Sequence, residues 1–442
     1  MLAKIKQAFW LLLMVLLASS LLVITINLPA FDEELLEEIQ TISAQQVVAE
    51  DRNNAIYWLA GLASPEQGEL HELGKKVLAL AAESVTNEVD AIKKGESPND
   101  VDAWMANYQA LTCHTQTEQG CHRKLANEIV AKPITSDRAR QLLERYRSLI
   151  SEPGLHFHST ADYRISLYGM TWAMPLKLQR FHIASALTES DAMATVELLS
   201  RDLTFWRMVL RRADTILVKM IASAAIANNL KGFSEHIAAT SAINDSLLQA
   251  YRASLKQLNV PEWSFANAFV GELIMVDPIF PDTYDLFNGA ALVSQNAATK
   301  NLMYVSYYKP WTTISSLSPE AYFELLQKCQ NEQVTEPRCL LDMEAKINPV
   351  TILYNPFGKM MASFTHIGFK NYLSRVHDLN GLILLINAQL SLKVSGAELS
   401  QQAVDALSYK NPYTNEPFQW NETTRQLSFI CIGDKPFCSI TL

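Results

Sequence analysis

Two residues with ionisable side chains lie inside strongly apolar stretches, where burial could prepare them for chemistry. Glu272 lies in the segment FANAFVGELIMV, so we expect its carboxyl group to be buried and held protonated, as a general acid requires. The alternative is structural: a buried glutamate is often paired with a lysine or arginine. Glu272 is therefore the candidate catalytic residue of this sequence.

The second such residue is Lys219, in the segment DTILVKMIA. Its apolar neighbours predict that at least the stem of the side chain is buried, and a pair with Asp214 or Glu272 would satisfy its charge. A ligand-binding lysine is the functional alternative.

A histidine and an aspartate are adjacent at His377 and Asp378, and His366 precedes them by eleven residues. Metal-dependent phosphohydrolases use histidine–aspartate pairs, which makes His377 and Asp378 candidate metal ligands. Such sites need further ligands at matching helical positions. The competing interpretation is an ordinary polar helix face.

The usual catalytic signatures do not occur. The sequence has no G-x-S-x-G, no G-x-G-x-x-G and no phosphate-binding loop, and His71-Glu72 lacks the second histidine of a zinc protease motif. We therefore predict no cofactor, and the pattern favours a protein that is not an enzyme.

The six cysteines form three pairs of near neighbours in the sequence: Cys113 with Cys121, Cys329 with Cys339, and Cys431 with Cys438. This clustering predicts three local disulfides, which persist in oxidising compartments. His114 and His122 directly follow the first two cysteines, so a zinc site of two Cys and two His is the alternative for that pair.

An uncharged run from Ala8 to Ile26 could cross a membrane and would then determine on which side the rest of the chain lies. Its nineteen residues would span about 28 Å as a helix, close to the hydrocarbon thickness of a bilayer. Lys4 and Lys6 precede it, and only acids follow closely, so the positive-inside rule predicts a cytoplasmic N-terminus. A cleaved signal peptide is the alternative, but the small residues Ala18-Ser19-Ser20 lie mid-run.

The remaining chain reads as a helical globule. It carries 49% hydrophobic and 19% charged residues with a net charge of −9, which argues against nucleic acid as a partner. Capping residues and apolar spacing predict helices from Ser159 or Thr160 to about Leu187, from Ser190 or Asp191 to about Leu230, and over Ile243 to Leu258, Pro319 to Gln330 and Tyr372 to Leu392.

We expect a mainly α fold, with helical hairpins stacked as an array or irregular bundle and a small C-terminal β-hairpin. Six segments follow from the sequence: 1–7 as a cytoplasmic tail, 8–28 as the transmembrane anchor, 29–155 as an N-terminal helical region with a disulfide loop, 156–276 as central helical hairpins, 277–371 as a proline-rich irregular region with a disulfide loop, and 372–442 as a C-terminal helix and a β-hairpin closed by Cys431 and Cys438.

The irregular region contains an aromatic cluster, YVSYYKPW, formed by Tyr304, Tyr307, Tyr308 and Trp311. Such clusters can stack on sugars or form interface hot spots, although a patch that caps the hydrophobic core is the ordinary alternative.

Two stretches carry a resemblance: FWRMVLRRADTILVKMIASAA from Phe205 to Ala225, and NPYTNEPFQWNETTRQLSF from Asn411 to Phe429. Together with the anchor and the loop LTCHTQTEQGC, they resemble a group of membrane-anchored, mostly helical periplasmic proteins of Gram-negative bacteria. The resemblance implies a single-pass inner-membrane protein that faces the periplasm. It implies no activity.

The expected function is that of a non-enzymatic scaffold or binding module in the cell envelope, with the membrane and other envelope proteins as partners. An anchored enzyme that acts on a glycan or lipid, with Glu272 as general acid, is the alternative.

Overall fold

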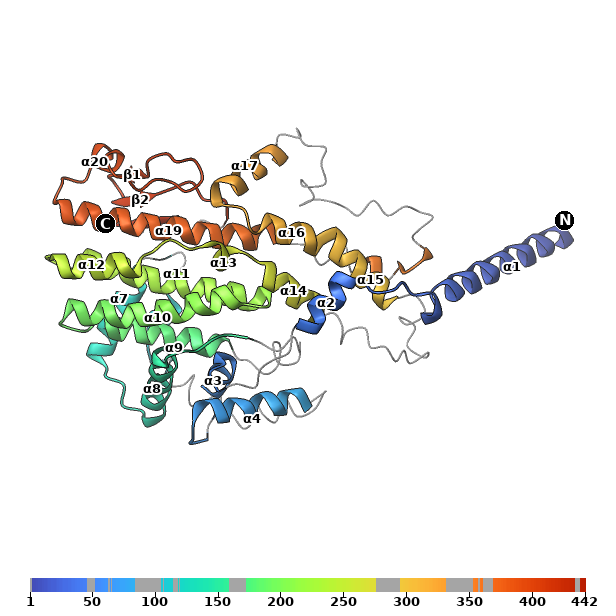
Figure 1. Cartoon of the computed structure of the whole chain (residues 1–442), viewed down its shortest axis with the longest axis horizontal. Coiled ribbons are helices and arrows are strands. Elements are labelled where there is room, and N and C mark those ends of the chain that lie inside the picture. Colours follow the sequence, from blue (N-terminus) through green and yellow to red (C-terminus); the bar gives the residue numbers. More distant parts are fainter. Residues whose placement is uncertain are drawn as a thin grey trace.

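The computed structural model describes residues 2–45, 52–62, 64, 66–83, 105, 107–113, 118, 120–158, 172–275, 295–330, 353–356, 358–360, 369–433 and 438–442. Within these residues the chain is mostly helical, and a small antiparallel sheet lies near the C-terminus (Figure 1). The mainly α fold class predicted from the sequence is therefore confirmed at this level.

The first helix, α1 (Leu2–Ile26), extends away from the rest of the described chain (Figure 1). Residues Ile5–Ile26 form a helix long and apolar enough to cross a membrane. The segment expected to span the membrane, residues 8–28, is thus helical as far as Ile26, with the length and composition that a membrane span requires.

Several shorter helices follow α1. Their bounds are η1 (Pro29–Phe31), α2 (Glu37–Gln45), α3 (Ala55–Gly61), α4 (Leu70–Glu83), η2 (Gln109–Thr112), α7 (Cys121–Ala131) and α8 (Asp137–Ser151). Of these, α2 lies beside α15 (Asn296–Met303), whereas α3, α4 and α8 lie on the opposite side of the body (Figure 1). Helices α3 and α4 approach closely at Gly74, where an added Cβ would lie 1.7 Å from the carbonyl oxygen of Tyr57. Only glycine fits there.

Four long helices form the centre of the body: α9 (Ala173–Ala186), α10 (Ala192–Arg212), α11 (Ile216–Ala239) and α19 (Phe369–Ser395). Helix α10 packs on α9 and α11, and α11 packs on α19 (Figure 1). The single helix predicted from Ser190 or Asp191 to about Leu230 is wrong, because the chain turns between α10 and α11. Thr215 begins the second helix, since its hydroxyl oxygen accepts a hydrogen bond from Val218 N at 3.1 Å.

The central helices enclose a buried carboxylate. Asp202 of α10 accepts hydrogen bonds from the hydroxyl of Tyr146, the amide of Gln179 at 2.8 Å and the amide of Asn229 at 2.8 Å. These donors come from α8, α9 and α11. Burial raises the pKa of Asp202, while the three donors lower it. The network fixes how four helices meet.

Three shorter helices follow α11: α12 (Asp245–Ser254), α13 (Val260–Trp263) and α14 (Ala266–Met275). The helix predicted over Ile243 to Leu258 is therefore shorter than expected. Leu255 closes α12, with its N–H donating to the carbonyl of Tyr251 at 2.9 Å, and Asn259 starts α13 with a capping box.

Within the region expected to be irregular, residues 296–314 are helical instead: α15 (Asn296–Met303), the π-helix η6 (Tyr304–Tyr308) and α16 (Lys309–Ile314). The one helix expected there, over Pro319 to Gln330, is present as α17 (Pro319–Gln330). Pro310 follows the π-helix η6 within a helical run that has no break, since Tyr308 and Lys309 are both helical. Pro319 begins α17. These prolines thus lie at a π-helix junction and at a helix start, and do not mark a loss of structure.

The C-terminal region packs beside α19 and contains α20 (Gln401–Asp405) and the strands β1 (Gln419–Asn421), β2 (Gln426–Ser428) and β3 (Ser439–Thr441). The strands pair in the order β1-β2-β3, all antiparallel. The expected hairpin is present as β1 and β2. The third strand was not predicted, and the cysteines do not close the hairpin: Cys431 and Cys438 lie in the connection between β2 and β3.

Candidate functional site

Glu272, the candidate acid, lies on α14 and contacts the start of α11. Its Oε1 accepts a hydrogen bond from Ile216 N at 2.8 Å, so it caps that helix. The pKa of its carboxyl group is raised to about 7, mainly by burial; the bond from Ile216 lowers the pKa, and the nearby Asp214 adds a smaller increase. The expected protonation is therefore consistent with a structural role at a helix end.

Lys219 is fully buried, as expected from its flanks. Its Nζ donates to the carbonyl of Leu210 at 2.8 Å and lies 5.4 Å from the centre of the Phe265 ring. Burial lowers the pKa of this lysine to about 7, and Glu262 acts in the opposite direction. A carbonyl and an aromatic face thus hold the ammonium group.

His377 and Asp378 both lie on α19, but their side chains leave the helix in different directions because adjacent residues are about 100° apart. His377 packs between aromatic rings, with the Tyr322 ring at 5.0 Å, and burial lowers its pKa to about 3. Asp378 accepts hydrogen bonds from Tyr413 Oη at 2.7 Å and from Gly433 N at 2.8 Å. Asp378 therefore holds the C-terminal loop, and His366 lies outside the described residues.

The cysteine pairs Cys113–Cys121 and Cys431–Cys438 have their sulfur atoms at bonding distance, each with a Cα–Cα separation of 5.7 Å. Cys329 is also disulfide-bonded, and its expected partner Cys339 lies outside the described residues. The geometry favours the disulfide over zinc for the first pair; His114 lies outside the described residues.

The aromatic cluster belongs mostly to the core. Tyr307, Tyr308 and Trp311 are buried, and Trp311 packs edge-on against Phe369 of α19 at 5.7 Å between ring centres. Their rings are therefore occupied by packing within the protein.

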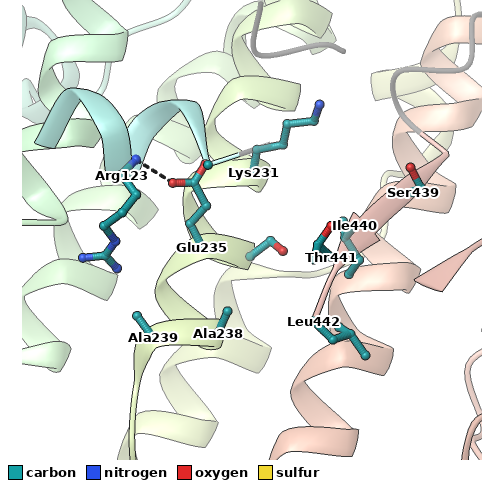
Figure 2. A pocket seen from close by; sticks show the side chains of 11 residues that line it. Arg123, Lys231, Glu235, Ala238, Ala239, Ser439, Ile440, Thr441 and Leu442 are labelled. Carbon is teal, nitrogen blue, oxygen red and sulfur yellow. Dashed lines mark hydrogen bonds between the residues drawn. The ribbon is translucent and has the colours of Figure 1, made fainter. Parts of the chain in front are cut away.

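A groove lies between α11 and β3, and we name it the α11–β3 groove. Its volume is about 520 Å³, and it is lined by Gly120, Arg123, Lys231, Ser234, Glu235, Ala238, Ala239, Ser439, Ile440, Thr441 and Leu442. Figure 2 shows the charged side chains gathered at one end, with Ala238, Ala239 and Leu442 at the other. A concave, largely apolar surface with a few polar groups at one end is typical of a binding site.

Glu235 lies at the charged end of the groove. Its carboxylate accepts hydrogen bonds from the backbone N–H groups of Arg123 at 2.7 Å and His122 at 3.4 Å, in the first turn of α7. Burial raises the pKa of Glu235 to about 7, although both amides and the cations of Arg123 and Lys231 lower it. Desolvation therefore outweighs every stabilising neighbour of the anion.

The two cations beside Glu235 differ in their surroundings. Burial lowers the pKa of Lys231 to about 8, against the opposite effect of Glu235. The guanidinium of Arg123 donates from Nη1 to the carbonyl of Leu187 at 3.2 Å, which fixes its position on α7. One end of the groove thus combines two cations with a carboxyl group that titrates near neutral pH.

The opposite wall is formed by all three residues of β3. Successive side chains of a strand point to opposite faces, so a surface lined by three consecutive residues lies along the edge of the strand. In the β2–β3 pairing, Phe429 N donates to Cys438 O and Leu442 N donates to Arg425 O. Since bonded positions alternate, the backbone groups of Ser439 and Thr441 point away from β2.

Sequence reasoning did not find this groove. Lys231 and Glu235 are four residues apart on a helix, a spacing that places them on one face, and this was the available signal. Their position beside Arg123 and β3 depends on contacts over more than one hundred residues of sequence.

Comparisons with models of protein families, with curated proteins and with solved structures find no match. The functional argument therefore starts from the geometry of the groove.

Proposed function

We propose that this protein is a non-enzymatic binding module of the bacterial cell envelope that holds an extended segment of a partner protein in the α11–β3 groove. The observation that carries the proposal is the edge of β3, which forms one whole wall of the groove. An exposed strand edge binds an extended peptide by adding it to the sheet, with main-chain hydrogen bonds that supply affinity.

The sheet has an unpaired edge at β3 in the part of the chain that the structure describes. Its order is β1-β2-β3, so within the described residues β3 has a neighbour on one side only. The N–H and C=O groups of Ser439 and Thr441 point to the other side, where α11 forms the facing wall. Edge strands with backbone groups directed outward are templates for pairing with another chain.

The lining of the groove suggests what the segment carries. Arg123 and Lys231 favour an acidic side chain at one end, because opposite charges attract strongly where solvent is partly excluded. Ala238, Ala239 and Leu442 favour small or aliphatic side chains along the remainder. We therefore expect a short extended segment with an acidic residue followed by apolar ones.

Photocrosslinking tests this proposal. A photoreactive amino acid placed at Ala239 or at Thr441, both exposed in the groove, should give the same protein adduct in intact cells. The same amino acid at Met193, an exposed residue of α10 outside the groove, is the control and should give none.

The substitution Thr441→Pro sharpens the test, since proline removes the outward N–H of the strand edge. The adduct formed from Ala239 should fall by about tenfold, which corresponds to about 1.4 kcal/mol. Thr441→Val keeps the N–H and should retain the adduct. Strand addition is contradicted if the yield of the adduct from Ala239 does not change in the Thr441→Pro variant, or if the adduct proves to be a lipid or glycan.

The proposal includes the location of the protein. We infer a single-pass inner-membrane protein with residues 1–7 in the cytoplasm and the body in the periplasm, where its helices form an irregular bundle of helical hairpins. Support comes from the apolar helix Ile5–Ile26 and from the disulfides, which fit an oxidising compartment. A reporter enzyme that is active only in the periplasm, fused after Leu442, should be active, and a silent fusion contradicts this orientation.

The enzymatic alternative rests on the raised pKa of Glu272, which would suit a general acid for a glycan or lipid substrate. The substitution Glu272→Gln separates the two functions. A binding module should keep its cellular function at normal protein level, whereas an enzyme that depends on this acid should lose it.

A further inference from the structure

Asn27, the residue directly after α1, ties the end of that helix to a distant part of the chain. Its side chain is buried, with 1% of its surface exposed. Its Nδ2 donates to the carbonyl of Leu353 at 2.8 Å, and its Oδ1 accepts from Asn355 N at 2.7 Å. The exit of α1 is thus bonded directly to residues 353–355.

A second connection joins the same exit to α15. Gln295 donates from Nε2 to the carbonyl of Leu28 at 3.0 Å. The carboxylate of Asp32 accepts from Ala297 N at 2.9 Å and Ala298 N at 3.0 Å, in the first turn of α15. Because two separate segments hold the exit through buried or partly buried hydrogen bonds, α1 has a defined direction relative to the body.

Three large apolar side chains are exposed around this junction. The exposed fraction is 58% for Phe31, 44% for Leu353 and 44% for Met360. Tyr354, which follows Leu353, bonds to the chain beside the other two: its hydroxyl donates to the carbonyl of Phe31 at 3.3 Å, and its carbonyl accepts at 2.6 Å from Nζ of Lys359, the residue before Met360. We name Phe31, Leu353 and Met360 the junction patch.

The position of the junction patch relative to α1 identifies what covers it. Ile26 is the last residue of the apolar span, and Leu353 is bonded to the side chain of the next residue. The headgroup layer of a bilayer extends about 5 to 7 Å beyond the hydrocarbon on each side. A residue in contact with Asn27 therefore lies at the depth of that layer when α1 crosses the membrane.

We propose that the junction patch inserts into the headgroup layer of the leaflet in which α1 ends, so that the body rests on the membrane in one orientation. Apolar and aromatic side chains at this depth are stabilised by contact with the acyl boundary. The proposal rests on the membrane anchoring included in the proposed function, and it is independent of the α11–β3 groove.

Fluorescence quenching in the full-length protein tests the inference. The protein is placed in nanodiscs of phosphatidylethanolamine and phosphatidylglycerol, and a genetically encoded fluorescent amino acid replaces one residue at a time. Lipids with a nitroxide on the headgroup should quench the fluorophore at Leu353 and at Met360 by about twofold or more. Encoding the fluorophore leaves the disulfide cysteines unmodified.

Two control positions make the outcome decisive. Val394, at the far end of α19, has an exposed fraction of 43%, nearly that of Leu353, and its fluorophore should not be quenched. Leu16, in the middle of α1, should be quenched by lipids brominated in the acyl chain.

If Leu16 is quenched while Leu353 and Met360 behave like Val394, the patch proposal is wrong and the anchor stands. If the fluorophore at Leu16 is not quenched, α1 does not cross the membrane. That result would contradict both the proposed membrane location and the insertion of the junction patch.

Discussion

Glu235 and Glu272 are two glutamates in nearly the same situation at opposite ends of α11. Each lies on a helix, each accepts hydrogen bonds from the first turn of another helix, and burial raises the pKa of each to about 7. Only Glu235 lines the α11–β3 groove. Comparing the two therefore shows that burial raises the pKa of a glutamate whether or not it lies in a binding surface.

The neighbours of the two carboxyl groups are opposite in charge. Glu272 faces Asp214, which disfavours its ionised form, whereas Glu235 faces Arg123 and Lys231, which favour it. The same pKa thus results from two different balances of desolvation and charge. A carboxyl group that titrates near neutral pH is not by itself a sign of catalysis, since burial of a structural carboxyl group at a helix end raises its pKa too.

The first prediction tests whether the two glutamates differ in their contribution to stability, by removing each carboxyl group. Glu272→Ala should lower the free energy of unfolding by about 3 kcal/mol, because it leaves the buried Ile216 N–H without its acceptor and creates a cavity. Glu235→Ala should cost about 1 kcal/mol, since water in the groove can bond to the α7 amides. Urea unfolding in detergent micelles measures both. Equal losses would contradict the distinction between the two sites.

A second prediction concerns the disulfide beside Glu235. Cys113–Cys121 closes the loop that leads into α7, so replacing both cysteines with alanine should lower the free energy of unfolding by about 2.5 kcal/mol. Amide hydrogen exchange at His122 and Arg123 should accelerate by roughly tenfold or more, while Ile216 keeps its protection.

The control for the disulfide is the pair Cys431 and Cys438, which closes a loop of similar length. Its removal should cost a similar free energy of unfolding and leave exchange at His122 unchanged. Faster exchange at Ile216 in the Cys113 variant would show that the two ends of α11 are not independent.

The third prediction is a pH dependence. For each glutamate the pKa rises from an ordinary 4.5 to about 7 in the folded protein, so the folded state binds more protons between these values. The stabilisation by the neutral carboxyl is therefore fully present below pH 4.5 and is lost as the pH rises through 7. Each group should account for about 2 kcal/mol after allowance for solvent screening.

Glutamine substitutions assign this pH dependence. Glu235→Gln and Glu272→Gln should each make the change in stability between pH 5 and pH 8 more positive than in the unmodified protein, and the double variant should show the sum of the two effects. Lys219 and His377, whose pKa values are lowered by burial, act in the opposite direction and do so equally in every variant. A double variant with the same pH dependence as the unmodified protein would contradict the raised pKa of both carboxyl groups.

The sequence predicted those features that depend on local pattern. The apolar helix of membrane-spanning length, the burial of Lys219 and the long C-terminal helix follow from runs of apolar residues and helical spacing. The turn between α10 and α11 was missed because Asp214 and Thr215 lie in an otherwise helical pattern, and the hydroxyl cap of Thr215 decides the break.

The groove could not be predicted because its parts are distant in the sequence. Glu235 is 112 residues from Arg123, and β3 is a strand of three residues that forms only by pairing with β2. Short strands carry little local signal, and the burial of a polar residue such as Glu235 depends on which helix packs against it.

The length of α11 sets how far a partner must reach. From Ile216, capped by Glu272, to Glu235 in the groove, the helix rises about 28 Å at 1.5 Å per residue. Figure 1 shows the C-terminus and the sheet at the end of the body opposite α1. A partner anchored in the same bilayer would therefore need a linker of roughly nine or more extended residues to place its segment beside β3, whereas a freely diffusing partner would need none.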